Sequence, residues 1–344
     1  MQEQPPAPAA ARPLRRRVVV LPLQPAAGEP FDGTGLALHF LLGNVLALHT
    51  GLEEFWFGWR AQKIFPTPQG LRDYCRNAAP PLDVTRVARR QDVRYWLAGR
   101  VGQGGAPVLR LQLSDADGTP EWRDRIFAVT TEDGLVALRR QFLGWLAACG
   151  LPLPQGQEEK TLWPEESSTE GLMGLGKALE TFYCNGYAAD PRGIDTDPFE
   201  RAVAVAPGSY LALDLLGWAR YRRLDLPAAR EAFTAALEKN PHGVGVLNGL
   251  LRCAVQTGDE AGAYRWAEAI ATLRGGDGDA QKAAAAQLLA KNALGRGDAR
   301  AAAALYRKAT AWAPTRKLYA DGLATALEAT GPGTGRAHPS RADR

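Results

Sequence analysis

The sequence predicts a protein of two parts, an α/β domain followed by an all-α array of helix pairs. The composition changes near residue 150, from a mixed region rich in Val, Trp and Arg to an alanine-rich one. Apolar residues alternate with polar ones in the first part, which is typical of strands, whereas helical spacing dominates the second. In the second part the same residue types also return at fixed offsets, which indicates a repeat.

These patterns divide the chain into five segments. We assign 17–150 to the α/β domain and 171–330 to the helical array, and a polar linker joins them over 151–170. Residues 1–16 are rich in Pro, Ala and Arg, and residues 331–344 are rich in Gly and polar groups, so both ends are predicted to be disordered tails.

Composition excludes several classes of protein. The 344 residues are 46% hydrophobic and 23% charged, as in an ordinary globular protein, and the net charge of +4 is small for a nucleic-acid-binding protein. The four cysteines form no CxxC pair and the four histidines form no HExxH motif, so we expect reduced thiols, no metal site and no cofactor. We expect no nucleic acid as a partner.

No membrane span or signal peptide is predicted. The apolar run near the N-terminus, VVVLPL, is shorter than a secretory h-region, and no run reaches the length of a spanning helix. We therefore expect a cytoplasmic protein. A periplasmic or envelope-associated location is the alternative if the true start of the chain differs.

The α/β domain is predicted to open with a strand and a helix. Residues 17–23, RVVVLPL, form a β-branched run typical of a buried strand. Helical spacing follows from residue 36 to residue 48, with Thr34 as the expected N-cap. The same criteria predict a second strand over 51–59 and a short helix over 83–91 with Asp83 as its cap.

The stretch YWLAGRVGQGG, residues 95–105, contains four glycines, which raises the question whether they form a nucleotide-binding loop. A phosphate-binding loop needs a strand before the glycines and a helix after them. Here Pro107 and an alternation through Leu109, Leu111 and Leu113 follow, which predicts a strand instead. We interpret the glycines as the tip of a β-hairpin, followed by a strand over 121–129 and a helix over 133–150.

Three stretches of the first part resemble the TolB-like N-terminal domain. They are RVVVLPLQP, FDGTGLALHFL and, most specifically, RRQDVRYWLAGRVGQGGAPVLRLQLSDADG. The resemblance covers residues 17–150 and implies a compact α/β domain with a mixed sheet and no catalytic residues. In bacterial proteins this domain is often followed by helical repeats and is associated with protein contacts.

The second part contains a repeated frame. In residues 213–241 the positions of the frame are Leu216, Gly217, Asp225, Ala229, Phe233, Ala236 and Pro241. The next copy lacks the closing proline and has Leu247, Leu250, Ala254, Gly258, Asp259, Ala263, Ala267 and Ile270. A third copy has Leu289, Gly297, Asp298, Ala302, Tyr306, Ala309 and Pro314. A degenerate earlier copy has Phe199, Ala202 and Pro207, with an inserted loop before it.

This frame resembles the tetratricopeptide repeat (TPR), a 34-residue pair of antiparallel helices. Small residues let the two helices approach, an aromatic side chain fills the space between repeats, and proline ends the second helix. The resemblance implies an all-α TPR solenoid of four repeats, one of them irregular, closed by a capping helix over KLYADGLATALEA.

The first helices of such an array line a concave groove, which can hold an extended or helical peptide. Arg222, Arg252 and Lys291 are candidates for capturing an acidic peptide, although a solvated groove without a ligand is an equal alternative. The predicted groove residues are Asp214, Trp218, Tyr221, Arg222, Asn248, Arg252, Gln256, Gln287 and Lys291.

The function predicted from the sequence is a non-catalytic scaffold or adaptor that binds partner proteins in the groove, with the α/β domain as a second contact. The alternative is a regulatory module whose α/β domain senses a small anion or nucleotide, and an enzyme of unknown class ranks third because no catalytic motif is present. The arginines of 86–100 are interpreted as a solvated face, and Trp56, Phe57 and Trp59 as core.

Overall fold

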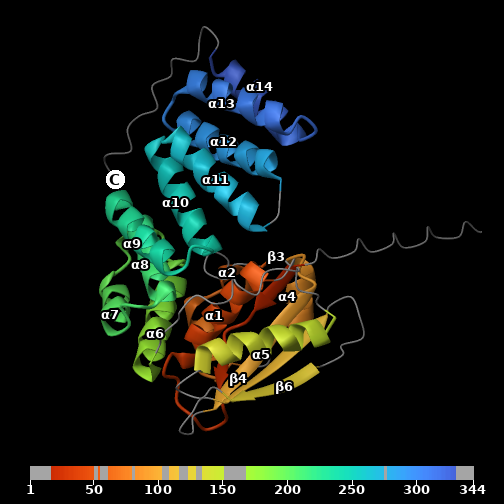
Figure 1. Ribbon diagram of the computed structural model, residues 1–344, viewed down its shortest axis with the longest axis vertical. Helices are drawn as coiled ribbons and strands as arrows, with labels where there is room; N and C mark the ends of the chain where they lie inside the picture. Colours follow the sequence, from red (N-terminus) through yellow and green to blue (C-terminus); the bar gives the residue numbers. More distant parts are fainter. Residues whose placement is uncertain are drawn as a thin grey trace, which may run out of the picture. The chain divides into compact units, whose positions relative to one another are not determined.

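The computed structural model describes residues 17–49, 53–54, 61–79, 82–102, 108–115, 123–128, 134–150, 168–274 and 277–330. Contacts divide the chain between Ala219 and Arg220 into two compact units. The first unit combines a β-sheet with helices, and the second is helical (Figure 1).

The sheet of the first unit is mixed, with strand order β3-β1-β4-β5-β6 and β2 beside β4. The strands β1, β2 and β3 pair in parallel with their neighbours, whereas β4, β5 and β6 pair antiparallel. The strands are β1 (Arg17–Val20), β2 (Gln24–Pro25), β3 (Glu53–Glu54), β4 (Tyr95–Gly102), β5 (Val108–Asp115) and β6 (Arg123–Ala128).

The β-hairpin predicted around the glycine-rich stretch is confirmed. β4 and β5 pair antiparallel from Tyr95 opposite Asp115 to Gly102 opposite Val108. Leu109, Leu111 and Leu113 are buried, as expected for one face of a strand. The tip of the hairpin, 103–107, lies outside the described residues. A chain that leaves its glycines into a strand does not form a strand-to-helix phosphate loop there.

Helices surround the sheet in the first unit. α1 packs against β1, β4 and α5, while α3 packs against β2 and α4 against β4. The helices are α1 (Thr34–His49), α2 (Ala61–Ile64), α3 (Pro68–Cys75), α4 (Val84–Arg90) and α5 (Gly134–Ala148).

The N-cap predicted from the sequence agrees with the structure at α4 but not at α1. Asp83 caps α4, as predicted, because its carboxylate accepts the N–H of Arg86 at 3.0 Å. At α1 the expected cap, Thr34, is itself the first helical residue, and Asp32 accepts both its N–H and its hydroxyl. The sequence analysis missed α3, although Thr67 before Pro68 is a helix-start signal and its hydroxyl accepts the N–H of Gly70.

The first helices after the linker belong to the first unit. α6 (Thr169–Asn185) packs against α1, α3 and α7 (Asp197–Val205). A methyl group on Gly176 would lie 1.8 Å from the carbonyl oxygen of Gly33, so the two backbones touch. The predicted boundary over 151–170 therefore differs from the division of contacts, which falls within α8 (Tyr210–Arg222).

A buried hydrogen bond joins α1 to α6. The Nε2 atom of His39 lies 2.9 Å from the hydroxyl of Tyr183. Burial lowers the pKa of His39 to about 3, so the imidazole is neutral in the folded protein. At the end of α3, Arg76 forms an ion pair of 2.8 Å with Glu180 on α6.

The second unit is a succession of helices joined by short turns (Figure 1). α10 packs against α9 and α11, α12 against α11 and α13, and α13 against α14. The helices are α9 (Leu226–Lys239), α10 (Val244–Thr257), α11 (Glu260–Arg274), α12 (Gly278–Gly295), α13 (Ala299–Trp312) and α14 (Lys317–Glu328).

Three turns of this region share one design. In each turn a residue with positive φ is followed by an aspartate that caps the next helix. Asp259 accepts the N–H of Gly262 and Asp298 that of Ala301, both at 2.9 Å. The positive-φ residues and their caps are Leu224 with Asp225, Gly258 with Asp259 and Gly297 with Asp298.

An aromatic ring meets a glycine twice at the same interval. A methyl group on Gly249 would lie 2.4 Å from the ring of Phe233, and one on Gly322 would lie 2.3 Å from the ring of Tyr306. The glycine follows the aromatic residue by sixteen positions in both cases. These helices therefore approach closely because a large side chain packs on a missing one.

Candidate functional site

α10 and α12 carry polar side chains at matching positions. Arg252 precedes the positive-φ Gly258 by six residues, and Lys291 precedes Gly297 by the same number. One helical turn earlier, both helices have an amide, Asn248 on α10 and Gln287 on α12. The two helices thus present the same pattern, an amide followed by a cation at i+4, on one face of each.

A hydrogen bond brings these two turns together. The Nδ2 atom of Asn292 on α12 donates to the carbonyl oxygen of Val255 on α10 at 2.6 Å. Lys291 immediately precedes Asn292, and Val255 is one turn beyond Arg252. Since α10 and α12 also pack against each other, the two cations lie on neighbouring turns.

The cations are open to solvent. Arg252 and Lys291 are exposed, and Asn248 and Gln287 are half-buried. Neither cation forms an ion pair with any residue that the structure describes. α10 contains no acidic residue, and the acidic residue of α12 is Asp279 in its first turn.

A third cation adds to this surface. Arg296 follows the last residue of α12, and its guanidinium reaches the turn at Gly258, where an added methyl group would lie 3.8 Å from it. We call the exposed or half-buried side chains of Asn248, Arg252, Gln287, Lys291 and Arg296 the cationic face. A positively charged surface with amides beside it can bind carboxylates and peptide groups.

Three of the predicted groove residues lie elsewhere. Asp214, Trp218 and Arg222 are 1%, 2% and 6% exposed, so their side chains are buried rather than presented in a groove. They follow one another at four-residue intervals on α8 and form a buried stripe of that helix. The sequence analysis could not separate them from their exposed or half-buried counterparts on α10, because each occupies the same repeat position as Asn248, Arg252 or Gln256.

Burial also changes the charge of this stripe. It raises the pKa of Asp214 to about 8, although the indole N–H of Trp218 favours the ionised form. The carboxyl group is therefore protonated at neutral pH. Asp214 is not a source of negative charge for a ligand.

The remaining two predicted residues lie beside the cationic face. Tyr221 is half-buried, and its hydroxyl accepts a weak hydrogen bond of 3.5 Å from the Nε2 atom of the exposed Gln256. The sequence analysis missed Asn292 and Arg296. Their signal is a polar side chain in the last turn of α12 or directly after it, where it can reach a neighbouring helix.

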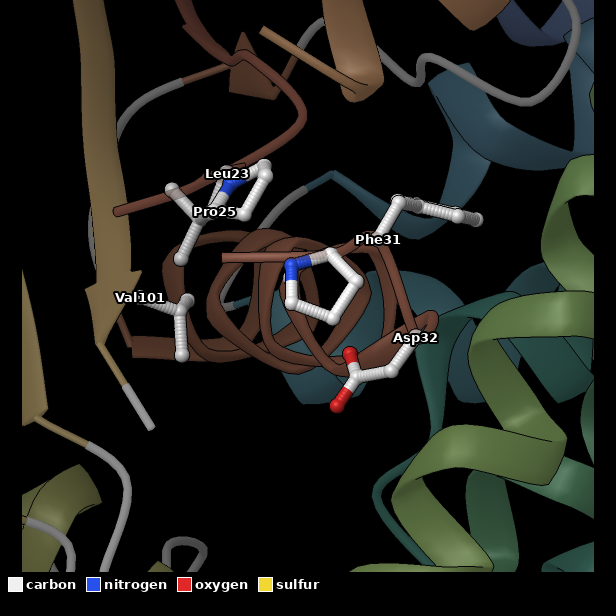
Figure 2. A pocket seen from close by; sticks show the side chains of 7 residues that line it. Leu23, Pro25, Phe31, Asp32 and Val101 are labelled. Carbon is white, nitrogen blue, oxygen red and sulfur yellow. The ribbon is translucent and has the colours of Figure 1, made fainter. Parts of the chain in front are cut away.

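A small hollow in the α/β domain lies between β2, β4 and the start of α1. Figure 2 shows Asp32 on one side of it, with Leu23, Pro25 and Val101 on the other. It has room for a single water molecule. The carboxylate and the small volume both oppose an anion or nucleotide at this place.

Other candidates for chemistry are placed as follows. The four cysteines lie in the described part of the chain and form no disulfide, and burial raises the pKa of Cys75, Cys184 and Cys253, so these thiols are protonated at neutral pH. Within the described ranges, no group of three His, Cys, Asp or Glu residues could hold a metal ion.

The arginines before the hairpin are partly paired. Arg86 lies 3.8 Å from Asp83, and Arg94 forms an ion pair of 3.0 Å with Asp115, whereas Arg90 and Arg100 are exposed. The side chain of Arg89 and the segment with Trp56, Phe57 and Trp59 lie outside the described residues.

None of the helices that the structure describes is both long and apolar enough to cross a membrane. In comparisons with known proteins, the chain matches no protein-family model and no curated protein.

Proposed function

We propose that the chain is a non-catalytic adaptor that binds a protein partner on the cationic face of α10 and α12. In this proposal the helices from α6 onward form a TPR array of four repeats with α14 as the capping helix. The sheet and its helices form a TolB-like domain that supplies a second contact. A cytoplasmic location is part of the same proposal.

The recurring turns and the aromatic–glycine pairs support the repeat. A positive-φ residue, an aspartate cap and a ring packed on a glycine are local devices, and their return at the same offsets favours one repeated unit over an unrelated helical bundle. The antiparallel hairpin beside parallel strands supports the likeness to the TolB-like domain.

One observation carries the binding function. Arg252 and Lys291 are exposed at the same repeat position on adjacent helices, and neither has an acidic neighbour to pair with in the described part of the chain. Surface cations are usually balanced by nearby acids, as Lys282 is by Glu268 at 2.7 Å. An unbalanced pair held by adjacent helices is a ready contact for a partner.

Selection from a random peptide library displayed on phage tests this proposal. The full chain should select peptides whose affinity falls at least about tenfold in the variants Arg252→Glu and Lys291→Glu. Arg307→Glu is the matched control, because Arg307 is an exposed cation on α13, a helix that carries no residue of the cationic face. Peptides that bind all three variants as they bind the wild type would refute the proposed surface.

A further inference from the structure

We propose that the cationic face recognises an extended acidic segment with two acidic residues three positions apart. The inference rests on the proposed function, since it names the ligand class of the same surface. It goes further by fixing both the conformation of the ligand and the spacing of its charges.

On each of the helices α10 and α12, the amide and the cation at i+4 together form one binding subsite. A carboxylate can accept charge-assisted hydrogen bonds from Arg252 or Lys291. The amide one turn earlier has a donor and an acceptor for the backbone of an extended peptide, which keeps its own N–H and C=O groups unpaired. Although Asn248 donates to the carbonyl of Val244 at 2.9 Å, its side-chain oxygen still accepts. The two subsites on α10 and α12 can therefore bind two acidic residues of one peptide.

The distance between these two subsites determines the spacing of the acidic residues in the ligand. Directly packed helices have axes about 8–10 Å apart, and the bond from Asn292 to Val255 places α10 and α12 in direct contact. A polyproline II segment rises about 3.1 Å per residue and has three residues per turn, so residues i and i+3 share one side about 9 Å apart. In a β-strand the same-side spacings are about 7 and 13 Å. The polyproline II spacing is therefore the best match.

The surface has two ends that limit the ligand. On α14 the positions that match Asn248 and Arg252 are Asp321 and Thr325, because Gly322 matches Gly249 in its packing on an aromatic ring. On α8 the matching residues are Asp214 and Trp218, which are buried. Two subsites are thus available, and the negative charge of the exposed Asp321 would repel a third acidic residue of the ligand.

Two fluorescein-labelled peptides of the same composition test the spacing. GEPPEPG has its glutamates three positions apart, and GEEPPPG has them adjacent, while the prolines favour polyproline II in both. Fluorescence anisotropy with the full chain should give at least about fivefold tighter binding of GEPPEPG. Arg252→Glu and Lys291→Glu should each weaken it about tenfold, and Arg307→Glu should change it less than about twofold.

Three results would overturn the inference. They are equal binding of the two isomers, equal weakening by Arg307→Glu, and no binding of either isomer at millimolar concentration. The phage selection separates this failure from a failure of the proposed function. If selected peptides depend on Arg252 and Lys291 but lack paired acidic residues, the surface is correct and the ligand class is wrong.

Discussion

Replacing Gly249 by alanine tests the packing that relates the helix pairs. The new methyl group would lie 2.4, 2.5 and 2.6 Å from three atoms of the Phe233 ring. The ring is fully buried, so it cannot swing into solvent. Overpacking of this kind costs about 1–3 kcal/mol, and three contacts this short place the cost near 3. The helix propensity of alanine returns about 1 kcal/mol, which leaves a net loss of about 2 kcal/mol.

The control is Gly295→Ala, also in a helix, where an added methyl group meets nothing within 4 Å. This variant should gain about 0.5 kcal/mol from helix propensity alone, less than at Gly249, because Gly295 is the last residue of α12. Urea unfolding followed by circular dichroism at 222 nm measures both variants against the wild type. The packing argument is wrong if Gly249→Ala is as stable as Gly295→Ala.

A double-mutant cycle locates the strain. Phe233→Leu removes the ring atoms that the new methyl group would strike, so Gly249→Ala should cost nothing in that background. A loss of about 2 kcal/mol that persists without the ring would show that the cost arises elsewhere in α10.

Three further predictions concern stability. Leu224→Gly should stabilise the protein by about 0.5 kcal/mol, because leucine is strained at φ 63° where Gly258 is not, and a lower urea midpoint would contradict this. Burial raises the pKa of Asp214 to about 8, so the stabilising effect of the protonated carboxyl group is present below pH 4 and is lost as the pH rises towards 8. Asp214→Asn should remove this loss of stability, which amounts to at most about 1.4 kcal/mol per pH unit. An unchanged pH dependence of the free energy of unfolding would refute this prediction. Burial lowers the pKa of His39 to about 3, so the stabilising effect of the neutral imidazole is present above pH 6.5 and is lost as the pH falls towards 3. His39→Gln should make the free energy of unfolding less dependent on pH between 6.5 and 3. An unchanged dependence in this interval would contradict a buried neutral histidine.

The sequence predicted the elements with strong local signals. The hairpin followed from the alternation through Leu109, Leu111 and Leu113 beyond the glycines, and α4 followed from its Asp83 cap. The helix pairs of the second unit followed from residue types that recur at fixed offsets around Asp225, Asp259 and Asp298. These features depend on neighbours in sequence, which is why pattern reasoning reaches them.

Tertiary burial was beyond the same reasoning. Trp218, Arg252 and Lys291 share one repeat position, yet Trp218 is buried and the two cations are exposed. Which copy of a repeat remains open depends on what packs against it, and no local pattern carries that information. The same holds for α6, which joins the α/β domain through a glycine contact between residues 143 positions apart.

The central claim is that a partner binds on α10 and α12. Hydrogen–deuterium exchange of the full chain, with and without a saturating peptide from the phage selection, tests this most directly. The account predicts slower exchange in peptides from Val244–Thr257 and Gly278–Gly295, with Ala299–Trp312 unchanged. Protection confined to α13, or to the α/β domain, would contradict it.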